Sequence, residues 1–141
     1  ENIDVRKGYR AHDIRIIKSH FEATPFPYIK TDVGIVLEWY KKNGNKLHPL
    51  VLAGIFHQKL EKIHPFSDGN GRTGRMLLCA MLLSKGYPPL IIRKVNRGDY
   101  LDAMAAGDNA GLRGIEPKHY KGLISYLAQE LVASYWNNFN I

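Results

Sequence analysis

A polar turn between two apolar segments is the feature that most constrains the fold. Residues 52–63 place apolar side chains at helical spacing, and residues 76–83 form a continuous apolar run. Between them, Pro65, Gly69 and Gly71 interrupt regular structure. The sequence therefore predicts a helix, a tight loop, and a second helix that begins near the end of the glycine-containing turn.

The rest of the chain predicts a mainly α fold. Helices are expected over about residues 32–44, 49–63, 72–85 and 99–106, and from Pro117 onward. The helix over 72–85 is apolar all round and is expected to be the buried central helix. Before these helices, the segment 14–17, with three β-branched isoleucines, and the segment 24–29 predict a small β-hairpin. We expect one domain over residues 1–141, with the hairpin region at about 8–30 and a helical core at about 31–139.

Composition narrows the class of protein. With 141 residues and 45% hydrophobic content, the chain can bury a core without disulfides. Its one cysteine, Cys79, lies in the apolar run and favours a reducing compartment. No apolar stretch reaches the roughly 18 residues of a membrane span, and the polar start is no signal peptide. We expect a soluble, cytoplasmic domain with no membrane contact, and the non-methionine start suggests an excised part of a longer chain.

The basic charge favours anionic partners. Twenty Lys and Arg against thirteen Asp and Glu give a formal net charge of +7. These charges are scattered rather than gathered in a long run, which favours a solvated surface over a nucleic-acid groove. Nucleic-acid binding is therefore expected only through regions outside this chain.

The turn combines groups that suit a polyphosphate. Its two glycines let backbone N–H groups approach an anion, just where the helix N-terminus presents unpaired donors. Arg72 and Arg75 can bind phosphate oxygens through their guanidinium groups. His64 can accept a proton near neutral pH, and Asp68 can hold a divalent cation. The spacing is neither that of a P-loop nor that of the dinucleotide-binding fingerprint.

The string from His64 to Arg75 resembles the Fic family. It matches the family pattern His-x-Phe-x-(Asp/Glu)-Gly-Asn-Gly-Arg-x-x-Arg at every fixed position. The segment Lys7–Arg10, His57 and the pair Asp99-Tyr100 are similar to further family features. The resemblance covers about residues 7–130 and implies a Fic-like helical bundle with a small N-terminal β-hairpin, called the flap in this family.

The resemblance implies a protein adenylyltransferase, which transfers AMP from ATP to a Ser, Thr or Tyr hydroxyl of a protein target. In that reaction His64 would be the general base and Asp68 would hold Mg²⁺. The residues expected to bind the nucleotide are Ser67, Asp68, Gly69, Asn70, Gly71, Arg72, Arg75 and Tyr100. Phe66 is expected to pack inward, and Tyr100 has a buried structural role as its alternative.

The resemblance also implies two kinds of protein partner. The target would dock at the flap, about Ile14–Ile29, by strand addition. Many relatives carry an inhibitory Ser/Thr-x-x-x-Glu-Gly/Asn helix whose glutamate pairs with the second motif arginine, here Arg75. The nearest string, Ser125–Glu130, does not match it. Inhibition would then come from a missing segment or from a separate antitoxin-like partner, or would be absent.

Three other functions stay open. Related Fic proteins transfer phosphocholine or phosphate, although the kinase-like branch carries lysine where this chain has Gly71. A catalytically silent regulatory or DNA-associated module is a second alternative. A zinc hydrolase is the third, and the spacing of His57 and His64 disfavours it because no His-Glu-x-x-His arrangement is present.

Overall fold

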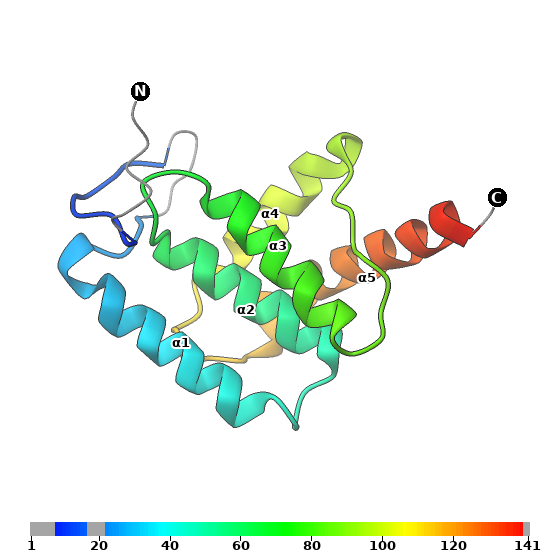
Figure 1. Cartoon of the computed structure of the whole chain (residues 1–141), viewed down its shortest axis with the longest axis horizontal. Helices are drawn as coiled ribbons and strands as arrows, with labels where there is room; N and C mark the ends of the chain where they lie inside the picture. Colours follow the sequence, from blue (N-terminus) through cyan, green and yellow to red (C-terminus); the bar gives the residue numbers. More distant parts are fainter. Residues whose placement is uncertain (1–7, 17–21, 140–141) are drawn as a thin grey trace.

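The computed structural model describes residues 8–16 and 22–139, and within these ranges it is all-helical, with no strand (Figure 1). Five α-helices and two short 3-10 helices follow one another along the described residues. They are η1 (Phe26–Tyr28), α1 (Ile29–Asn43), α2 (Pro49–Ile63), α3 (Asn70–Leu83), η2 (Lys94–Asn96), α4 (Arg97–Gly107) and α5 (Pro117–Phe139). No helix in the described part of the chain is long and apolar enough to span a membrane.

The central helix is α2, which packs against α1, α3, α4 and α5. Figure 1 shows it running between α1 and α3. The expectation that the helix after the turn would be the buried one is wrong, because α3 buries one face and leaves Met76 72% exposed. An apolar run allows a helix to be buried on all sides. Whether the helix is buried depends on which neighbouring helices pack against it.

The sequence of α2 does not indicate that this helix is buried, because several of its buried residues are polar. His57 and Lys59 are completely enclosed, yet each has an internal partner. The Nε2 atom of His57 lies 2.7 Å from the Tyr100 hydroxyl of α4. The Lys59 ammonium donates to the carbonyl groups of Gly111 and Gly114 at 3.0 and 2.7 Å. These bonds tie α4 and the loop after it to the centre of the molecule, and they satisfy groups that would otherwise be costly to bury.

The expected β-hairpin is not found among the described residues. Its central part, residues 17–21, lies outside them, and the segment 24–29 continues through a 3-10 turn into α1. The first residue of α1, Ile29, is 1% exposed and shares a core cluster with Val33. The sequence pattern placed Ile29 in a strand, whereas its spacing from Val33 suits one face of a helix.

Candidate active site

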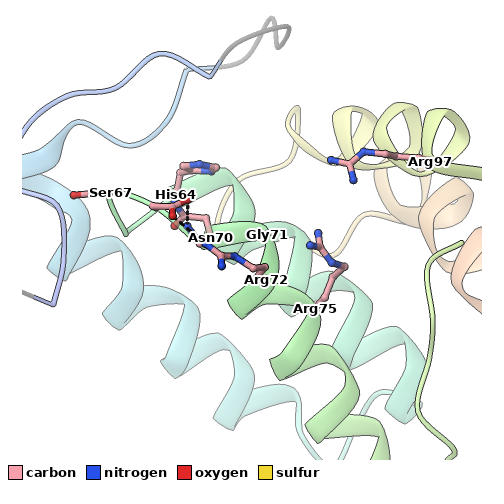
Figure 2. A pocket seen from close by; sticks show the side chains of 9 residues that line it. His64, Ser67, Asn70, Gly71, Arg72, Arg75 and Arg97 are labelled. Atoms are coloured by element: carbon pink, nitrogen blue, oxygen red, sulfur yellow. Dashed lines mark hydrogen bonds and ion pairs between the residues drawn. The ribbon is translucent and has the colours of Figure 1, made fainter. Parts of the chain in front are cut away.

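The polar turn lines an open pocket of about 290 Å³ at the junction of α2 and α3. Nine residues form its wall: His64, Ser67, Asp68, Gly69, Asn70, Gly71, Arg72, Arg75 and Arg97. Eight of these nine residues were expected from the sequence. Figure 2 shows His64 beside the loop, Arg72 and Arg75 on α3, and Arg97 reaching toward Arg75 from α4.

His64 ends α2 in the left-handed conformation, with φ 53° and ψ 60°. It is the one residue other than glycine with a positive φ in the described ranges. Such a conformation costs an ordinary residue roughly 1–2 kcal/mol. It turns the chain sharply out of the helix and leaves the imidazole at the pocket wall.

The imidazole is prepared to act as a base. Its Nδ1 atom lies 3.2 Å from the carbonyl oxygen of Glu61, which can only accept a hydrogen bond. Nδ1 therefore carries the proton, and Nε2 keeps a free lone pair. Burial lowers the pKa of His64, and the charge of Arg10 lowers it further, against the raising effect of the Glu61 carbonyl. The ring is accordingly neutral near pH 7.

Arg10 holds the backbone of His64 in place. The arginine is 4% exposed, and its Nε donates to the carbonyl oxygen of His64 at 2.8 Å. Its Nη2 atom reaches the carbonyl groups of Ile63, at 3.3 Å, and Thr24. A main-chain bond from Arg10 to Pro65 adds to these contacts. Sequence reasoning placed Arg10 in a family segment but gave it no part in the site, because its partners are distant backbone atoms.

The side chain of Asn70 closes the loop. Its Oδ1 accepts from the Phe66 N–H at 2.9 Å, and its Nδ2 donates to the Phe66 carbonyl at 2.7 Å. The Phe66 ring is half-buried and contacts the ring of Tyr9, with centroids 6.1 Å apart. The Asn70 amide thus shapes the loop, and the donor that this residue offers an anion is its backbone N–H.

The start of α3 is open to an anion. Gly69, in the N-cap position with φ 81°, has no side chain to bond the first N–H groups. A Cβ on Gly71 would lie 2.9 Å from Nη1 of Arg75, and one on Gly69 would lie 3.5 Å from Nη2 of Arg72. The two glycines therefore let both guanidinium groups lie close to the first turn of the helix. Unpaired N–H groups, the helix dipole and two cations converge there, as anion binding requires.

Asp68 is placed to share a cation with bound phosphates. Its Oδ2 lies 2.9 Å from Nη2 of Arg72, and its Oδ1 accepts from the Gly69 N–H at 2.6 Å. Both side chains of the ion pair are about two-thirds exposed or more, so the pair is weak and easily exchanged. One accessible carboxylate beside a phosphate site suits Mg²⁺, which takes most of its ligands from phosphates and water. Within residues 8–16 and 22–139, no cluster of three or more His, Cys, Asp or Glu side chains could hold a metal ion by itself.

Two residues, Tyr100 and Arg97, differ from the expected arrangement. Tyr100 is 5% exposed and bonded to His57, so it supports the core and does not line the pocket. Burial raises its pKa above the ordinary value. Arg97, the first residue of α4, reaches the pocket instead and approaches Arg75 from the opposite side (Figure 2). Ser67 is exposed at the loop edge, and its side chain points away from the arginines in Figure 2. Arg97 was missed because no local spacing links it to the turn.

Glu130, in the string nearest to the inhibitory pattern, has a structural role. Its side chain is 1% exposed, and its oxygens accept from Arg93 at 2.8 and 3.1 Å and from Asn96 at 2.7 Å. The hydrogen bonds and charge of Arg93 hold the Glu130 pKa at about 2. This carboxylate fastens the segment before α4 to α5.

Comparison with known proteins places these features in a family. The Fic/DOC family model matches residues 2–82. The protein adenylyltransferase Fic of Aedes aegypti is 37% identical over 102 residues, which cover 72% of this chain and 17% of that protein. A probable protein adenylyltransferase of Aquifex aeolicus is 31% identical over 142 residues, covering 100% of this chain and 43% of the relative. The chain thus spans less than half the length of these curated relatives.

Solved structures agree with the sequence match. A Fic-domain-containing signaling protein from Bacteroides thetaiotaomicron superposes with a TM-score of 0.80 at 26% identity, over 89% of this chain and 51% of the other. Fic-1 from C. elegans superposes with a TM-score of 0.70 at 27% identity, over 91% of this chain and 36% of the other. The family match covers more than half of the chain, and the helical fold and the turn from His64 to Arg75 accompany it. This chain belongs to the Fic/DOC family.

Proposed function

We propose that this chain is the catalytic core of a protein adenylyltransferase, which transfers AMP from ATP to a Ser, Thr or Tyr hydroxyl of a protein target. The observation that carries the proposal is the placement of a neutral His64 on the same pocket as the open N-terminus of α3. A base and a phosphate site are the two parts that nucleotidyl transfer needs. Relatives named protein adenylyltransferases support the choice of AMP.

His64 performs the proton transfer in this proposal. The target hydroxyl gives its proton to Nε2 of His64 while its oxygen forms a bond to the α-phosphorus of ATP. The bond from that phosphorus to the bridging oxygen breaks, and pyrophosphate leaves with the electron pair. General base catalysis of this kind contributes about 10²–10⁴ in rate.

The start of α3 and three arginines bind the phosphates. The backbone N–H groups of the first turn donate to the phosphate oxygens, and Arg72 and Arg75 bind them from the same helix. Arg97 closes the site from α4. Asp68 would hold Mg²⁺, which when bound neutralises charge on the phosphates and the leaving pyrophosphate. The protein atoms need little rearrangement, since the glycines already leave space for the guanidinium groups.

We place the two protein partners at either end of this pocket. The target would approach along residues 14–29, and this proposal is supported at Thr24, whose carbonyl shares Arg10 with the carbonyl of His64. An inhibitory segment or antitoxin-like partner would act at Arg75, where a carboxylate would compete with the outer phosphates.

Intact-mass measurement tests the transfer. The protein is incubated with Mg²⁺ and ATP, CTP, GTP or UTP, alone and with candidate targets. A gain of one AMP unit with ATP is expected, and a gain of phosphate mass, or of nothing, contradicts the proposal. His64→Ala is expected to lower labelling about 10²–10⁴-fold while nucleotide binding stays.

Two further variants make this test specific. His64→Asn keeps a residue type that tolerates the left-handed conformation and removes the base, so it separates chemistry from folding. His119→Ala changes a histidine outside the pocket and should label like the unmodified chain. Full labelling of His64→Asn would remove His64 from the role of base.

A further inference from the structure

Glu61 is a partly buried carboxylate that the proposed reaction does not use. It lies in the last turn of α2, three residues before His64, and its side chain is 16% exposed. Its Oε2 atom lies 3.9 Å from Nδ1 of His64. Its Oε1 atom is buried and has no hydrogen-bond partner within the described residues. A carboxylate oxygen that is buried without a hydrogen bond is costly, so the role of Glu61 at this place requires a physical explanation.

The fold leaves space for this carboxylate between α2 and α3. A Cβ on Gly74 would collide with Oε1 of Glu61 and would lie 2.9 Å from Nδ1 of His57. Nδ1 of His57 is likewise buried without a partner, and Nε2 of the same ring is paired with Tyr100. Two unpartnered polar atoms thus point at the same small space beneath the first turns of α3. The absence of a side chain at Gly74 is what admits them.

The charges around Glu61 allow it to ionise near neutral pH. Burial raises its pKa to about 7, against the lowering effect of Arg75 from α3. Tyr100 faces it from α4 and His57 from α2, and both are neutral at this pH because burial raises the pKa of the tyrosine and lowers that of the histidine to about 4. Arg10, from the N-terminal segment, acts on His64 and disfavours its protonated form. At pH 7 Glu61 is therefore about half ionised, and its ionised form is an anion 3.9 Å from Nδ1 of His64.

We propose that Glu61 is a positioning residue that stabilises the imidazolium form of His64 during transfer. This rests on the proposed function for its reaction. The proton of the target hydroxyl moves to Nε2, while the proton on Nδ1 stays and faces both the carbonyl and the carboxylate of Glu61. The carboxylate raises the basicity of His64 at the step that needs it, and Arg10 and burial keep the ring neutral beforehand.

Titration of His64 by NMR in the free protein tests this coupling without any substrate. Glu61→Gln keeps the side-chain size and removes the charge, and it is expected to lower the pKa of His64 by about one unit. The matched control is Glu38→Gln, which removes an exposed glutamate whose ion pair with Arg113 has the same 3.9 Å separation. This control should leave the His64 pKa unchanged. An unchanged His64 pKa in folded Glu61→Gln overturns the proposal.

A second variant and an activity profile complete the test. Glu61→Asp keeps the charge and should leave the His64 pKa above that of Glu61→Gln; equal values in the two variants contradict a charge effect. In labelling assays, Glu61→Gln should move the acidic limb of the pH–rate profile about one unit lower and reduce kcat about tenfold, with the KM for ATP unchanged. If the His64 pKa shifts but the unmodified chain transfers nothing, the proposed function fails and the coupling stands. If transfer is normal and the pKa does not shift, the coupling fails alone.

Discussion

Gly74 marks a close approach between α2 and α3, and Gly74→Ala is expected to destabilise the protein. The new Cβ would lie 2.9 Å from the His57 ring, well inside ordinary carbon contact distance. That ring cannot easily move, because it is completely buried and bonded to Tyr100. The Glu61 side chain would also have to shift. The two helices must therefore separate or the ring must leave its place.

The magnitude follows from two opposing effects. Overpacking of this kind typically costs about 1–3 kcal/mol. Alanine in a helix gains about 0.5–1 kcal/mol over glycine. Gly34→Ala is the matched control, because Gly34 lies inside α1 and nothing is within 4 Å of the Cβ position. Both variants gain the same helix propensity, so this gain cancels when their unfolding free energies are compared. We expect Gly74→Ala to be less stable than Gly34→Ala by about 1–3 kcal/mol.

Urea denaturation followed by circular dichroism measures this difference. Gly34→Ala should be slightly more stable than the unmodified chain, and Gly74→Ala clearly less stable than Gly34→Ala. Labelling by Gly74→Ala should also fall, by about 10–100-fold, because α3 would be displaced relative to His64. Equal stability of the two alanine variants would show that the packing of α2 against α3 at this point is not as tight as described.

Two further predictions concern residues on α4 and α5. Glu130 has a folded pKa of about 2, below its ordinary value, so its stabilising effect is complete above about pH 4.5 and is lost as the pH falls toward 2. Glu130→Gln should therefore be less stable than the unmodified chain at pH 7 and equal to it near pH 2. Urea denaturation at several pH values measures the difference in unfolding free energy between the two proteins. A difference that does not depend on pH contradicts the role of Arg93. If the pocket binds ATP as proposed, Arg97→Ala should raise the KM for ATP about tenfold with little change in kcat, because it removes an exposed cation from the pocket. Arg113→Ala, outside the pocket, should change neither value. Unchanged nucleotide affinity in Arg97→Ala would exclude that residue from phosphate binding.

The geometry of the turn from His64 to Arg75 was predictable because its parts are adjacent in sequence. The glycines, the helix start and the arginines one turn later act through short-range geometry, which the order of residues specifies. Helix α2 and its end at His64 were also predictable, from apolar spacing and from Pro49 at the first helical position. Residue identity alone did not reveal the left-handed conformation of His64, which depends on Arg10 and on the turn that follows.

The contributions from distant segments were not predictable in the same way. Arg97 and Tyr100 are one turn apart on α4, and only the packing of α4 against α2 and α5 decides that the first reaches the pocket and the second enters the core. Ile29 could belong to a strand or a helix, and the core cluster around Val33 decided for the helix. The burial of a residue depends on which helix surfaces pack against each other, and the local spacing of residues does not determine this packing.

The sequence by itself determined the family resemblance, the helical character and the chemistry of the turn, because each of these depends on residues that are near neighbours along the chain. The tertiary structure decided that α2 and not α3 is the central helix. It decided that Tyr100 is a core residue and that Arg97 lines the pocket. It also brought Glu61, His57 and Gly74 to one buried place behind His64. These outcomes arise from side chains that meet across helices, where space, burial and charge are set by the whole fold.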